Sequence, residues 1–385
     1  MPDAKAYNDR APLAVDSTVM PLRVAGVDPE REFAGGQSQV LGLTRELLRM
    51  GHRAELICDP AGKLFERAAL EGIRCHRLRL RNSVDFAGGM RLRSILAREG
   101  YDVVHFHTAR AHAMAPFARG LARALIATRR MDYRPNRLFA PFLYTRAVDG
   151  VAAISDAVAT ALSSAGVPRE RITVIPSGVD CEFFRPPSNE ERIAARLALG
   201  VAAETIAVGT IGGLEERKGH RYLLEAIAPA MPTVECFIAG EGSLRSELER
   251  RAEALGISTR TRFLGHIAAS RDLLWALDIF VFPSLWEGLG VAALEAAASG
   301  VATIASSAGG IAEVVRNGET GVLVAPANPR VLRDAITLLA ASADERKTLG
   351  EGARKRAVAE FAMGAMARRT MALYRACLGA RKDRT

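Results

Sequence analysis

Several features are scarce or missing in this 385-residue sequence, and each absence excludes a class of protein. No run of 18 or more apolar residues occurs, so a membrane-spanning helix is not expected. Aromatic residues make up 6% of the chain, and no nucleic-acid recognition motif is present. A basic nucleic-acid-binding protein would therefore explain the charge of the chain and little else.

Cysteine is also sparse. The five cysteines are Cys58, Cys75, Cys181, Cys236 and Cys377, and they show neither C-x-x-C spacing nor a Cys/His ligand pattern. This pattern excludes a disulfide framework and a zinc site, and it predicts reduced thiols in a cytoplasmic protein.

The first nineteen residues carry no apolar core segment and are not typical of a signal peptide. A strand pattern begins only at Leu22, so we expect residues 1–19 to form a disordered tail. A start of the chain at Met20 stays open as an alternative.

Positive charge is unevenly distributed. The net charge is +9; residues 1–185 hold 27 Lys and Arg against 20 Asp and Glu, a net +7, and the rest hold 25 against 23, a net +2. A basic first half favours an anionic partner, namely a membrane surface, a phosphorylated acceptor or nucleic acid. Arginine-rich residue usage in a high-GC genome is the alternative.

Strand-like and helix-like segments alternate through both halves of the chain. Such alternation predicts an α/β fold with two Rossmann-like, doubly wound parallel-sheet domains facing across a cleft. We expect a first domain at 20–183 and a second at 184–361, with the Pro-containing stretch 181–189 as the linker. The last segment, 362–385, is expected to be a helix that packs back on the first domain.

Two carboxylates stand out in "PSLWEGLGVAALEAAASG", residues 283–300, where Glu287 precedes Glu295 by eight residues. A helix that begins near Gly290 would direct free N–H groups at an anion. Eight helical residues rise about 12 Å, whereas the paired carboxylates of glycoside hydrolases lie about 5–9.5 Å apart. The pair therefore suits the two ends of an extended ligand better than a hydrolytic dyad.

Other candidate residues follow strands, where ligands bind in parallel sheets. They are the Gly35-Gly36 pair in the loop after the first strand, His105 and His107 at the end of "DVVHFH", Gly212 and Lys218 in "GTIGGLEERKGH", and Gly240 and Gly242 in "AGEG". Glycines leave room for a phosphate, and a lysine supplies positive charge. An ordinary turn, a solvated loop or a structural histidine is the alternative reading for each.

Taken in order, these segments resemble a known family. The chain resembles the retaining, GT-B-fold glycosyltransferases of group 1. The segments that carry the resemblance are "GHRAELI", "DVVHFH", "ITVIPSGVD", "KGHRYLLEAI", "FIAGEGSLRSEL" and the E-x7-E stretch from Glu287 to Glu295. That family includes phosphatidylinositol mannosyltransferases and lipopolysaccharide-core transferases. The resemblance covers nearly all of residues 22–375.

The resemblance implies a role for each matching position. Glu287, His107 and Lys218 would act at the reaction centre, with His105 a less favoured candidate on the acceptor side. The donor-binding residues would be Glu295, Gly35, Gly36, Gly212, Gly240, Gly242, His266, Leu289, Gly290 and Val291. The resemblance implies a nucleotide-sugar as substrate, no cofactor and no metal, and front-face attack with retention. A GT-B sugar-nucleotide epimerase is the alternative enzyme.

One departure from the family pattern concerns charge. Gly213 stands where the family usually carries an arginine, five residues before Lys218. Either Arg217 or an arginine of the first domain substitutes for it, or the activity is weak or altered. On the acceptor side, Arg129 and Arg130 lie in the cationic and aromatic stretch 128–136. Together with the basic first half, they predict an anionic lipid-linked or lipopolysaccharide-like acceptor, and peripheral association with the inner face of the cell membrane.

Overall fold

The computed structural model describes residues 20–131, 135–136, 140–228, 233–267 and 269–382. The tail expected at 1–19 lies outside these residues. The chain divides into two compact units. Unit 1 comprises the chain up to Gly178 and again from Met363, and unit 2 comprises Val179–Ala362.

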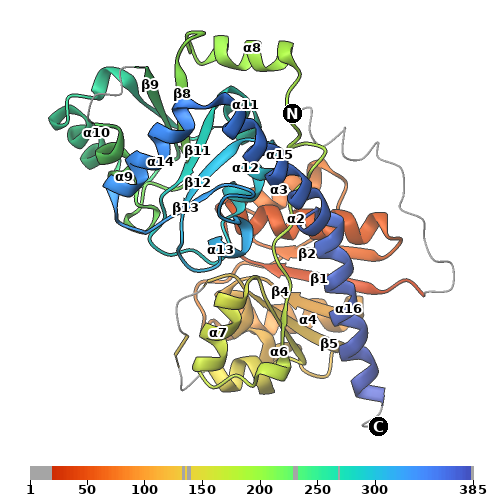
Figure 1. The fold of residues 1–385 in the computed structure, drawn as a ribbon. Coiled ribbons are helices and arrows are strands. Elements are labelled where there is room, and N and C mark those ends of the chain that lie inside the picture. The colour runs from red at the N-terminus through yellow and green to blue at the C-terminus, as the bar shows by residue number, and fades with distance from the viewer. Residues whose placement is uncertain (1–19, 132–134, 137–139, 229–232, 268, 383–385) are drawn as a thin grey trace. The chain divides into compact units, whose positions relative to one another are not determined.

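Unit 1 is built on a parallel sheet. Its described strands lie in the order β3-β2-β1-β4-β5-β6-β7. Figure 1 labels β1, β2, β4 and β5 of this sheet. The strands are β1 (Arg23–Asp28), β2 (Arg53–Cys58), β3 (Cys75–Arg77), β4 (Tyr101–Phe106), β5 (Ala122–Arg129), β6 (Gly150–Ala153) and β7 (Ile172–Val174). Because β1 pairs with β2 on one side and with β4 on the other, the strand order reverses there, and ligands bind at the carboxyl ends beside such a point.

Helices connect these strands. They are α2 (Gly35–Arg49), α3 (Lys63–Leu70), α4 (Phe86–Glu99), α5 (Ala109–Ala113), α6 (Ala115–Ala118) and α7 (Asp156–Ser164), with short turns η1 (Phe142–Arg146) and η2 (Arg169–Arg171). Helix α7 begins after Ser155, whose side chain accepts a hydrogen bond from the N–H of Val158 and so caps the first turn.

The last helix, α16 (Met363–Lys382), belongs to unit 1 although it lies at the other end of the sequence. It packs on α2, β5 and β6, and its Met371 and Tyr374 lie in one apolar core with Leu43. A side chain at Gly42 would collide with Met363, 2.6 Å from its Cε, so glycine on α2 permits the close approach of these two helices. Segments far apart in the sequence therefore complete one domain.

Unit 2 repeats the plan with the order β10-β9-β8-β11-β12-β13 among the described residues. Figure 1 labels these strands except β10. Its strands are β8 (Ile206–Ile211), β9 (Val234–Ala239), β10 (Thr261–Gly265), β11 (Ile279–Phe282), β12 (Ala302–Ser306) and β13 (Val322–Val324). All paired strands are parallel. Strand β8 pairs with β9 on one side and with β11 on the other, so the strand order reverses at β8.

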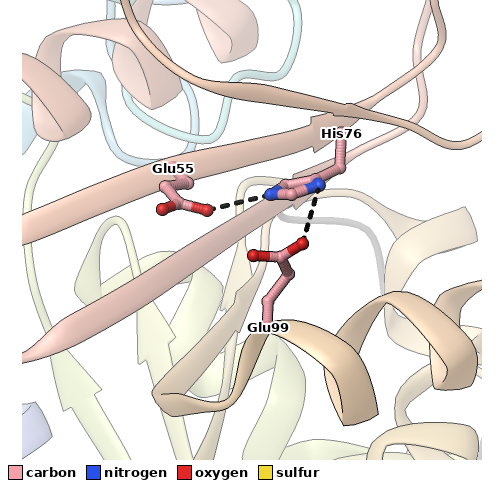
Figure 2. Close-up of side chains that lie close together, drawn as sticks. All are labelled: Glu55, His76 and Glu99. Carbon is pink, nitrogen blue, oxygen red and sulfur yellow. Dashed lines mark hydrogen bonds and ion pairs between the residues drawn. The ribbon is translucent and has the colours of Figure 1, made fainter.

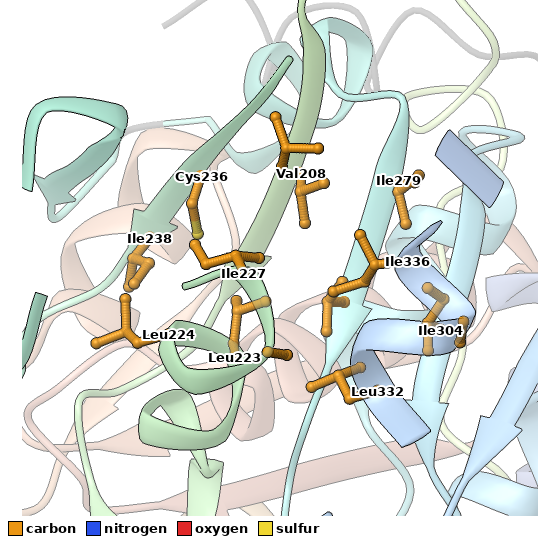
Figure 3. Packing of buried hydrophobic residues seen from close by; sticks show 14 of the residues in the cluster. Val208, Leu223, Leu224, Ile227, Cys236, Ile238, Ile279, Ile304, Leu332 and Ile336 are labelled. Atoms are coloured by element: carbon orange, nitrogen blue, oxygen red, sulfur yellow. The ribbon is translucent and has the colours of Figure 1, made fainter. Parts of the chain in front are cut away.

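The helices of unit 2 are α8 (Asn189–Ala198), α9 (His220–Ile227), α10 (Arg245–Ala254), α11 (Ser270–Ala276), α12 (Val291–Ala298), α13 (Ile311–Val314), α14 (Pro329–Ala341) and α15 (Ala343–Glu360), with short turns η3 (Glu216–Lys218) and η4 (Ser258–Arg260). Figure 3 shows the main core of this unit, where strand side chains such as Ile279 and Ile304 meet Leu223 of α9 and Ile336 of α14. Parallel strands are covered by helices, which is why their sequences are almost continuously apolar.

The α/β class and the two Rossmann-like parallel-sheet domains predicted from the sequence are confirmed. Within the described part of the chain, no helix combines the length and the apolar character that crossing a bilayer requires.

Candidate active site

Opposite charges gather in unit 2 where β8 and β11 end. Lys218 closes η3, and its ammonium group donates to the carboxylate of Glu287, which lies between β11 and α12. The Arg217 guanidinium is 3.5 Å from the same Glu287 oxygen. Burial lowers the pKa of Lys218, and the negative charge of Glu287 opposes that shift. Arg217 also pairs with Glu215, at 2.9 Å, so two cations face two carboxylates in this cluster. Lys218 and Arg217 lie side by side there and share one oxygen of Glu287.

Backbone contacts fix this arrangement. The N–H of Leu285 donates to the carbonyl of Arg217 at 2.8 Å, and the N–H of Gly310 donates to the carbonyl of Glu287 at 3.0 Å. Gly219 has φ +65°, and a Cβ there would lie 2.1 Å from the carbonyl oxygen of Pro283. The loop that carries Lys218 is therefore pressed against the loop that carries Glu287, at a distance that only glycine permits.

Helix α12 begins directly after this cluster. Val291 is its first residue, Gly290 is the N-cap with φ +93°, and Leu289 is buried. A Cβ on Gly290 would lie 2.4 Å from Cδ1 of Ile311, so this turn also requires glycine. The N–H groups of the first helical turn have no partner within the helix, which makes the start of α12 favourable for an anionic group.

Glu295 lies one turn further along α12. Its carboxylate accepts a 3.0 Å hydrogen bond from the hydroxyl of Ser270, the first residue of α11. Burial of the carboxyl group raises the pKa of Glu295 to about 7, and the Ser270 hydrogen bond opposes this shift. His266 follows β10 and is exposed. Glu295 thus holds a carboxyl group that titrates near neutral pH and is tied to one hydroxyl.

Gly212, Gly240 and Gly242 lie where the loops after β8 and β9 meet. A Cβ on Gly240 would lie 1.9 Å from the carbonyl oxygen of Gly212, and one on Gly242 would lie 2.4 Å from the carbonyl oxygen of Leu214. Backbone packing between the two loops therefore requires glycine at 240 and 242, whatever the loops bind, whereas a Cβ on Gly212 would lie 3.5 Å from the side chain of Lys218.

In unit 1, polar groups collect at the carboxyl end of β1. Asp28 is buried and accepts a 3.0 Å hydrogen bond from the side-chain amide of Gln37, and burial raises the pKa of its carboxyl group to about 6. Gly35 and Gly36 were expected in the loop after β1, but they form the first turn of α2. The Gln37 side chain accepts a hydrogen bond from the N–H of Ala34 at 3.2 Å, and this contact starts the helix there.

The two candidate histidines have different environments. His105, on β4, uses both ring nitrogens: Nδ1 is 2.7 Å from the Tyr374 hydroxyl and Nε2 is 2.6 Å from the Thr128 hydroxyl. His107 follows the strand, its ring lies 4.0 Å from the ring of His105, and its buried Nδ1 has no partner among the described residues. Burial lowers the pKa of both imidazoles well below the usual value, so both are neutral.

Arg129 and Arg130 follow one another at the end of β5. Arg129 is buried, and its Nε donates to the carbonyl of Met131 at 3.1 Å. The Cδ of Arg130 lies 3.7 Å from the position of a Cβ on Gly36, which sets this arginine beside the start of α2. Burial lowers the pKa of Arg130 to about 10, the charge of Asp28 opposes this shift, and its buried Nε has no partner among the described residues.

The structure therefore groups the sequence candidates within each unit. In unit 2 it joins Lys218 to Glu287, and in unit 1 it brings Arg130 close to Gly36. Sequence reasoning missed Asp28, Gln37 and Ser270. Asp28 carried a usable signal, because it is a charged residue at the end of a buried strand, whereas Ser270 is identified only by its contact with Glu295, 25 residues away.

A second polar cluster lies elsewhere in unit 1. Figure 2 shows Glu55 of β2, His76 of β3 and Glu99 at the end of α4, with their ligand atoms within 4.8 Å of one another. Arg74 pairs with both carboxylates, at 3.4 and 3.0 Å, and the Tyr101 hydroxyl donates to Glu55 at 2.6 Å. Because arginine already compensates the acidic charges, the cluster is explained as an ion network that joins β2 and β3 to α4.

Comparison with known families assigns both parts of the chain. Residues 192–356 match the family described as glycosyl transferases group 1, and residues 33–183 match glycosyltransferase family 4. Each matched region lies in one half of the chain, and together they contain most of the site residues described above.

Two curated relatives come from Rhizobium meliloti (strain 1021). The lipopolysaccharide core biosynthesis mannosyltransferase LpsB is 32% identical over 242 residues, which are 60% of this chain and 66% of LpsB. The lipopolysaccharide core biosynthesis glycosyltransferase LpsE is 30% identical over 279 residues, which are 72% of this chain and 76% of LpsE. The chain thus spans just under two thirds of LpsB, and about half the length of several other relatives.

Solved structures share the fold. The chain matches Anabaena Alr3699/HepE, solved in complex with UDP and glucose, with a TM-score of 0.83 and 22% identity over 92% of this chain and 100% of that one. Because the two sequences are only 22% identical, this similarity establishes a shared fold and does not establish a shared substrate or activity.

Proposed function

The chain belongs to the group 1 glycosyltransferases, and we propose that it transfers a sugar from a nucleotide-sugar donor to a glycan or lipid-linked acceptor, with retention at the anomeric carbon. The observation that carries the proposal is the Lys218–Glu287–Arg217 cluster beside the start of α12, with Glu295 eight residues after Glu287 in the same unit.

Unit 2 is the proposed donor-binding unit. A nucleoside diphosphate carries negative charge in its middle and hydroxyl groups on its ribose. Lys218, Arg217 and the first N–H groups of α12 match the diphosphate, and the Glu295 carboxylate matches the ribose hydroxyls. The glycines at 212, 240 and 242 keep the neighbouring loops free of side chains, and the backbone around His266 is proposed to contact the base.

The proposed chemical step exchanges one bond at the anomeric carbon. The bond from that carbon to the diphosphate oxygen breaks, a bond to the acceptor oxygen forms on the same face, and the acceptor proton passes to the departing diphosphate. Lys218, Arg217 and the N–H groups of α12 stabilise the charge that develops on the leaving oxygen. These groups supply that charge without a metal ion, so the proposal requires none.

Glu287 and His107 are assigned to the transferred sugar. Glu287 holds both cations through one carboxylate oxygen, and its position just before α12 lies next to the proposed diphosphate site. His107 is assigned because its buried Nδ1 lacks a partner among the described residues, whereas both nitrogens of His105 are in use. His105 is therefore proposed to support His107 rather than to contact substrate.

Unit 1 is the proposed acceptor-binding unit. The net +7 of residues 1–185 and the buried guanidinium of Arg130 favour an anionic acceptor. The names of LpsB and LpsE support a role in lipopolysaccharide or related envelope polysaccharide synthesis. Such an acceptor would place the protein in the cytoplasm, at the inner face of the cell membrane.

A donor panel tests the proposal. We expect one of a set of UDP-, GDP- and ADP-sugars to raise the melting temperature of the wild-type protein, because a ligand at 100 times its Kd adds about 2.7 kcal/mol to the stability of the folded state. The same compound should be hydrolysed slowly without acceptor. Lys218→Ala should lose most of the thermal shift, and Lys63→Ala, an exposed lysine in unit 1, should keep it.

Two results would contradict the assignment. If no nucleotide-sugar shifts the melting temperature or is hydrolysed, the chain is not a nucleotide-sugar transferase. If Lys218→Ala retains the full shift, the donor binds elsewhere. Recovery of an epimerised free nucleotide-sugar would replace transfer by epimerisation.

A further inference from the structure

An exposed apolar edge lies at the start of α4 in unit 1. Val84 is 85% exposed, Phe86 69% and Met90 45%, and all three fall within seven residues. Single apolar residues on a protein surface are ordinary, but large ones gathered on a short segment indicate a surface that contacts another molecule.

Arginine is frequent in the chain before and after this edge. Residues 77–98 contain six arginines, at positions 77, 79, 81, 91, 93 and 98, against one acidic residue, Asp85. All six arginines are exposed. The Asp85 carboxylate accepts hydrogen bonds from the N–H groups of Gly88 and Arg81, both at 2.9 Å, and lies 3.8 Å from the Arg91 guanidinium. Arg98 pairs with Glu99 at 3.0 Å. The arginines still outnumber these acidic partners, so the segment presents a positive surface.

The edge is held in place by packing between α4 and α6. The ring of Phe86 contacts the ring of Phe117 on α6 edge to face, with centroids 5.4 Å apart, and Arg93 donates to the carbonyl of Phe117 at 3.3 Å. A Cβ on Gly89 would lie 2.5 Å from the Phe117 ring, so α4 and α6 are in close contact. The apolar and basic side chains are thus displayed from fixed backbone, which lowers the entropy lost when they bind.

We propose that this docking edge, formed by Val84, Phe86 and Met90 with Arg81, Arg91 and Arg93, binds the surface of a bilayer that contains anionic lipid. Apolar side chains of this size enter the boundary between headgroups and acyl chains, while arginines beside them pair with lipid phosphates. Long arginine side chains also keep their charge at the headgroup level while their stems contact apolar lipid.

Charge decides against a second copy of the chain as the occupant. A symmetric contact through this edge would bring two strongly positive surfaces together with no acidic side chain free to compensate within residues 77–98. A sheet of lipid phosphates offers the opposite charge over the whole edge. The edge shares no residue with the 128–136 stretch that the sequence indicated for the acceptor side.

This proposal rests on the proposed function, because membrane docking would bring the protein to a lipid-linked acceptor. The vesicle-binding test uses neither donor nor acceptor, so a failure of membrane binding can be distinguished from a failure of the proposed sugar transfer. Wild-type protein should sediment with vesicles of phosphatidylcholine and phosphatidylglycerol, should bind vesicles of phosphatidylcholine alone weakly, and should be released as salt rises.

Variants locate the contact. Val84→Ser with Phe86→Ser should lower the partition coefficient about tenfold, and Arg81→Glu with Arg91→Glu should lower it by at least about tenfold. The matched controls lie in unit 2: Ile193→Ser with Leu197→Ser replaces exposed apolar residues of α8, and Arg250→Glu with Arg330→Glu reverses exposed charges. Both controls should bind as wild type does.

Two outcomes would overturn the proposal. The first is that the docking-edge variants bind anionic vesicles as strongly as the controls do, while all variants unfold at the wild-type temperature. The other comes from Phe86→Trp: its fluorescence should be quenched by brominated lipid in anionic vesicles, and the absence of quenching while the protein is bound would place the contact elsewhere. Donor turnover in solution should be unchanged in Phe86→Ser, and a loss there would indicate a damaged fold instead of lost docking.

Discussion

Lys218 and Arg217 are paired with one and the same oxygen of Glu287, Oε2. The three residues come from two loops whose backbones are hydrogen-bonded to each other through Leu285 and Arg217. Glu287 therefore orients two cations from adjacent positions of the chain. A substitution of Glu287 therefore affects the positions of both the Lys218 ammonium and the Arg217 guanidinium.

Glu287→Ala should lower kcat more than it changes the donor KM. Without the carboxylate, Lys218 loses its carboxylate partner and Arg217 keeps only Glu215, so the two cations are held less firmly where the leaving oxygen gains charge. A hydrogen bond to a charged group contributes about 1.5–3 kcal/mol, which corresponds to about one to two decades in rate. Steady-state kinetics with a saturating acceptor would measure the two parameters. Glu287→Gln keeps the shape of the side chain, so its kcat should lie between those of Glu287→Ala and wild type.

Glu295→Ala should show the opposite pattern, with a higher donor KM and a kcat close to that of wild type. Glu295 is assigned to the ribose, away from the breaking bond, so its contact strengthens the ground state and the transition state equally. We expect a rise in KM of about tenfold to a hundredfold. If Glu295→Ala lowers kcat and Glu287→Ala raises KM, the two roles must be exchanged.

Glu295 should also make stability depend on pH. Its pKa is about 7 in the folded protein, against 4.5 for the free side chain. The folded state therefore binds the proton more tightly than the unfolded chain does. This stabilisation is fully present below about pH 4.5 and is lost as pH rises through about 7.

Glu295→Gln stays neutral and should lack that dependence. Between about pH 5 and about pH 8, the unfolding free energy of wild type should fall relative to Glu295→Gln by about 2 kcal/mol, which allows for the partial exposure of the residue. Urea midpoints of both proteins across this range would measure the difference. Parallel curves would mean that the carboxyl group titrates normally.

Arg217 should supply the cation that Gly213 lacks. Its guanidinium lies 3.5 Å from Glu287, beside Lys218. Arg217→Ala should therefore reduce donor turnover by about tenfold to a hundredfold, while Gly213→Arg alone should change it little. A Cβ at 213 would lie 3.3 Å from Oε1 of Glu215, the end of a flexible side chain, so an arginine is sterically acceptable there.

The double variant, Gly213→Arg with Arg217→Ala, should recover part of the loss, and a double-mutant cycle would measure how far the two positions substitute for each other. A large gain from Gly213→Arg in the wild-type background would show that Arg217 does not fill the role.

The architecture was predictable because strand and helix patterns are local. The helix expected to begin near Gly290 begins at Val291, and the strand pattern expected from Leu22 corresponds to β1, which begins at Arg23. Strand β3 has no such local signal, because Cys75–Arg77 is three residues long and carries polar side chains. Gly35 and Gly36 were assigned to a loop because glycine disfavours helix, and the Gln37 side chain that caps Ala34 outweighs that preference.

Partners within the candidate site were less predictable, because they are distant in sequence. Lys218 meets Glu287 across 69 residues, and Ser270 meets Glu295 across 25. Residue type and position after a strand identify candidates at a sheet edge, but the close approach of two loops through Gly219 or Gly240 depends on tertiary packing. The catalytic and binding roles of these residues stay predictions until kinetics test them.

His105 and His107 should separate stability from activity. His105 holds the hydroxyls of Thr128 and Tyr374, so His105→Ala leaves both without this partner and loosens α16 from the sheet. The loss of about 2–4 kcal/mol should lower the melting temperature by roughly 5–15 °C. His107→Ala removes a ring whose Nδ1 has no partner among the described residues, so it should cost less stability and lower kcat by about tenfold or more. Calorimetry and kinetics on both variants would decide. A His107→Ala protein that is as unstable as His105→Ala and fully active would make His107 a structural residue.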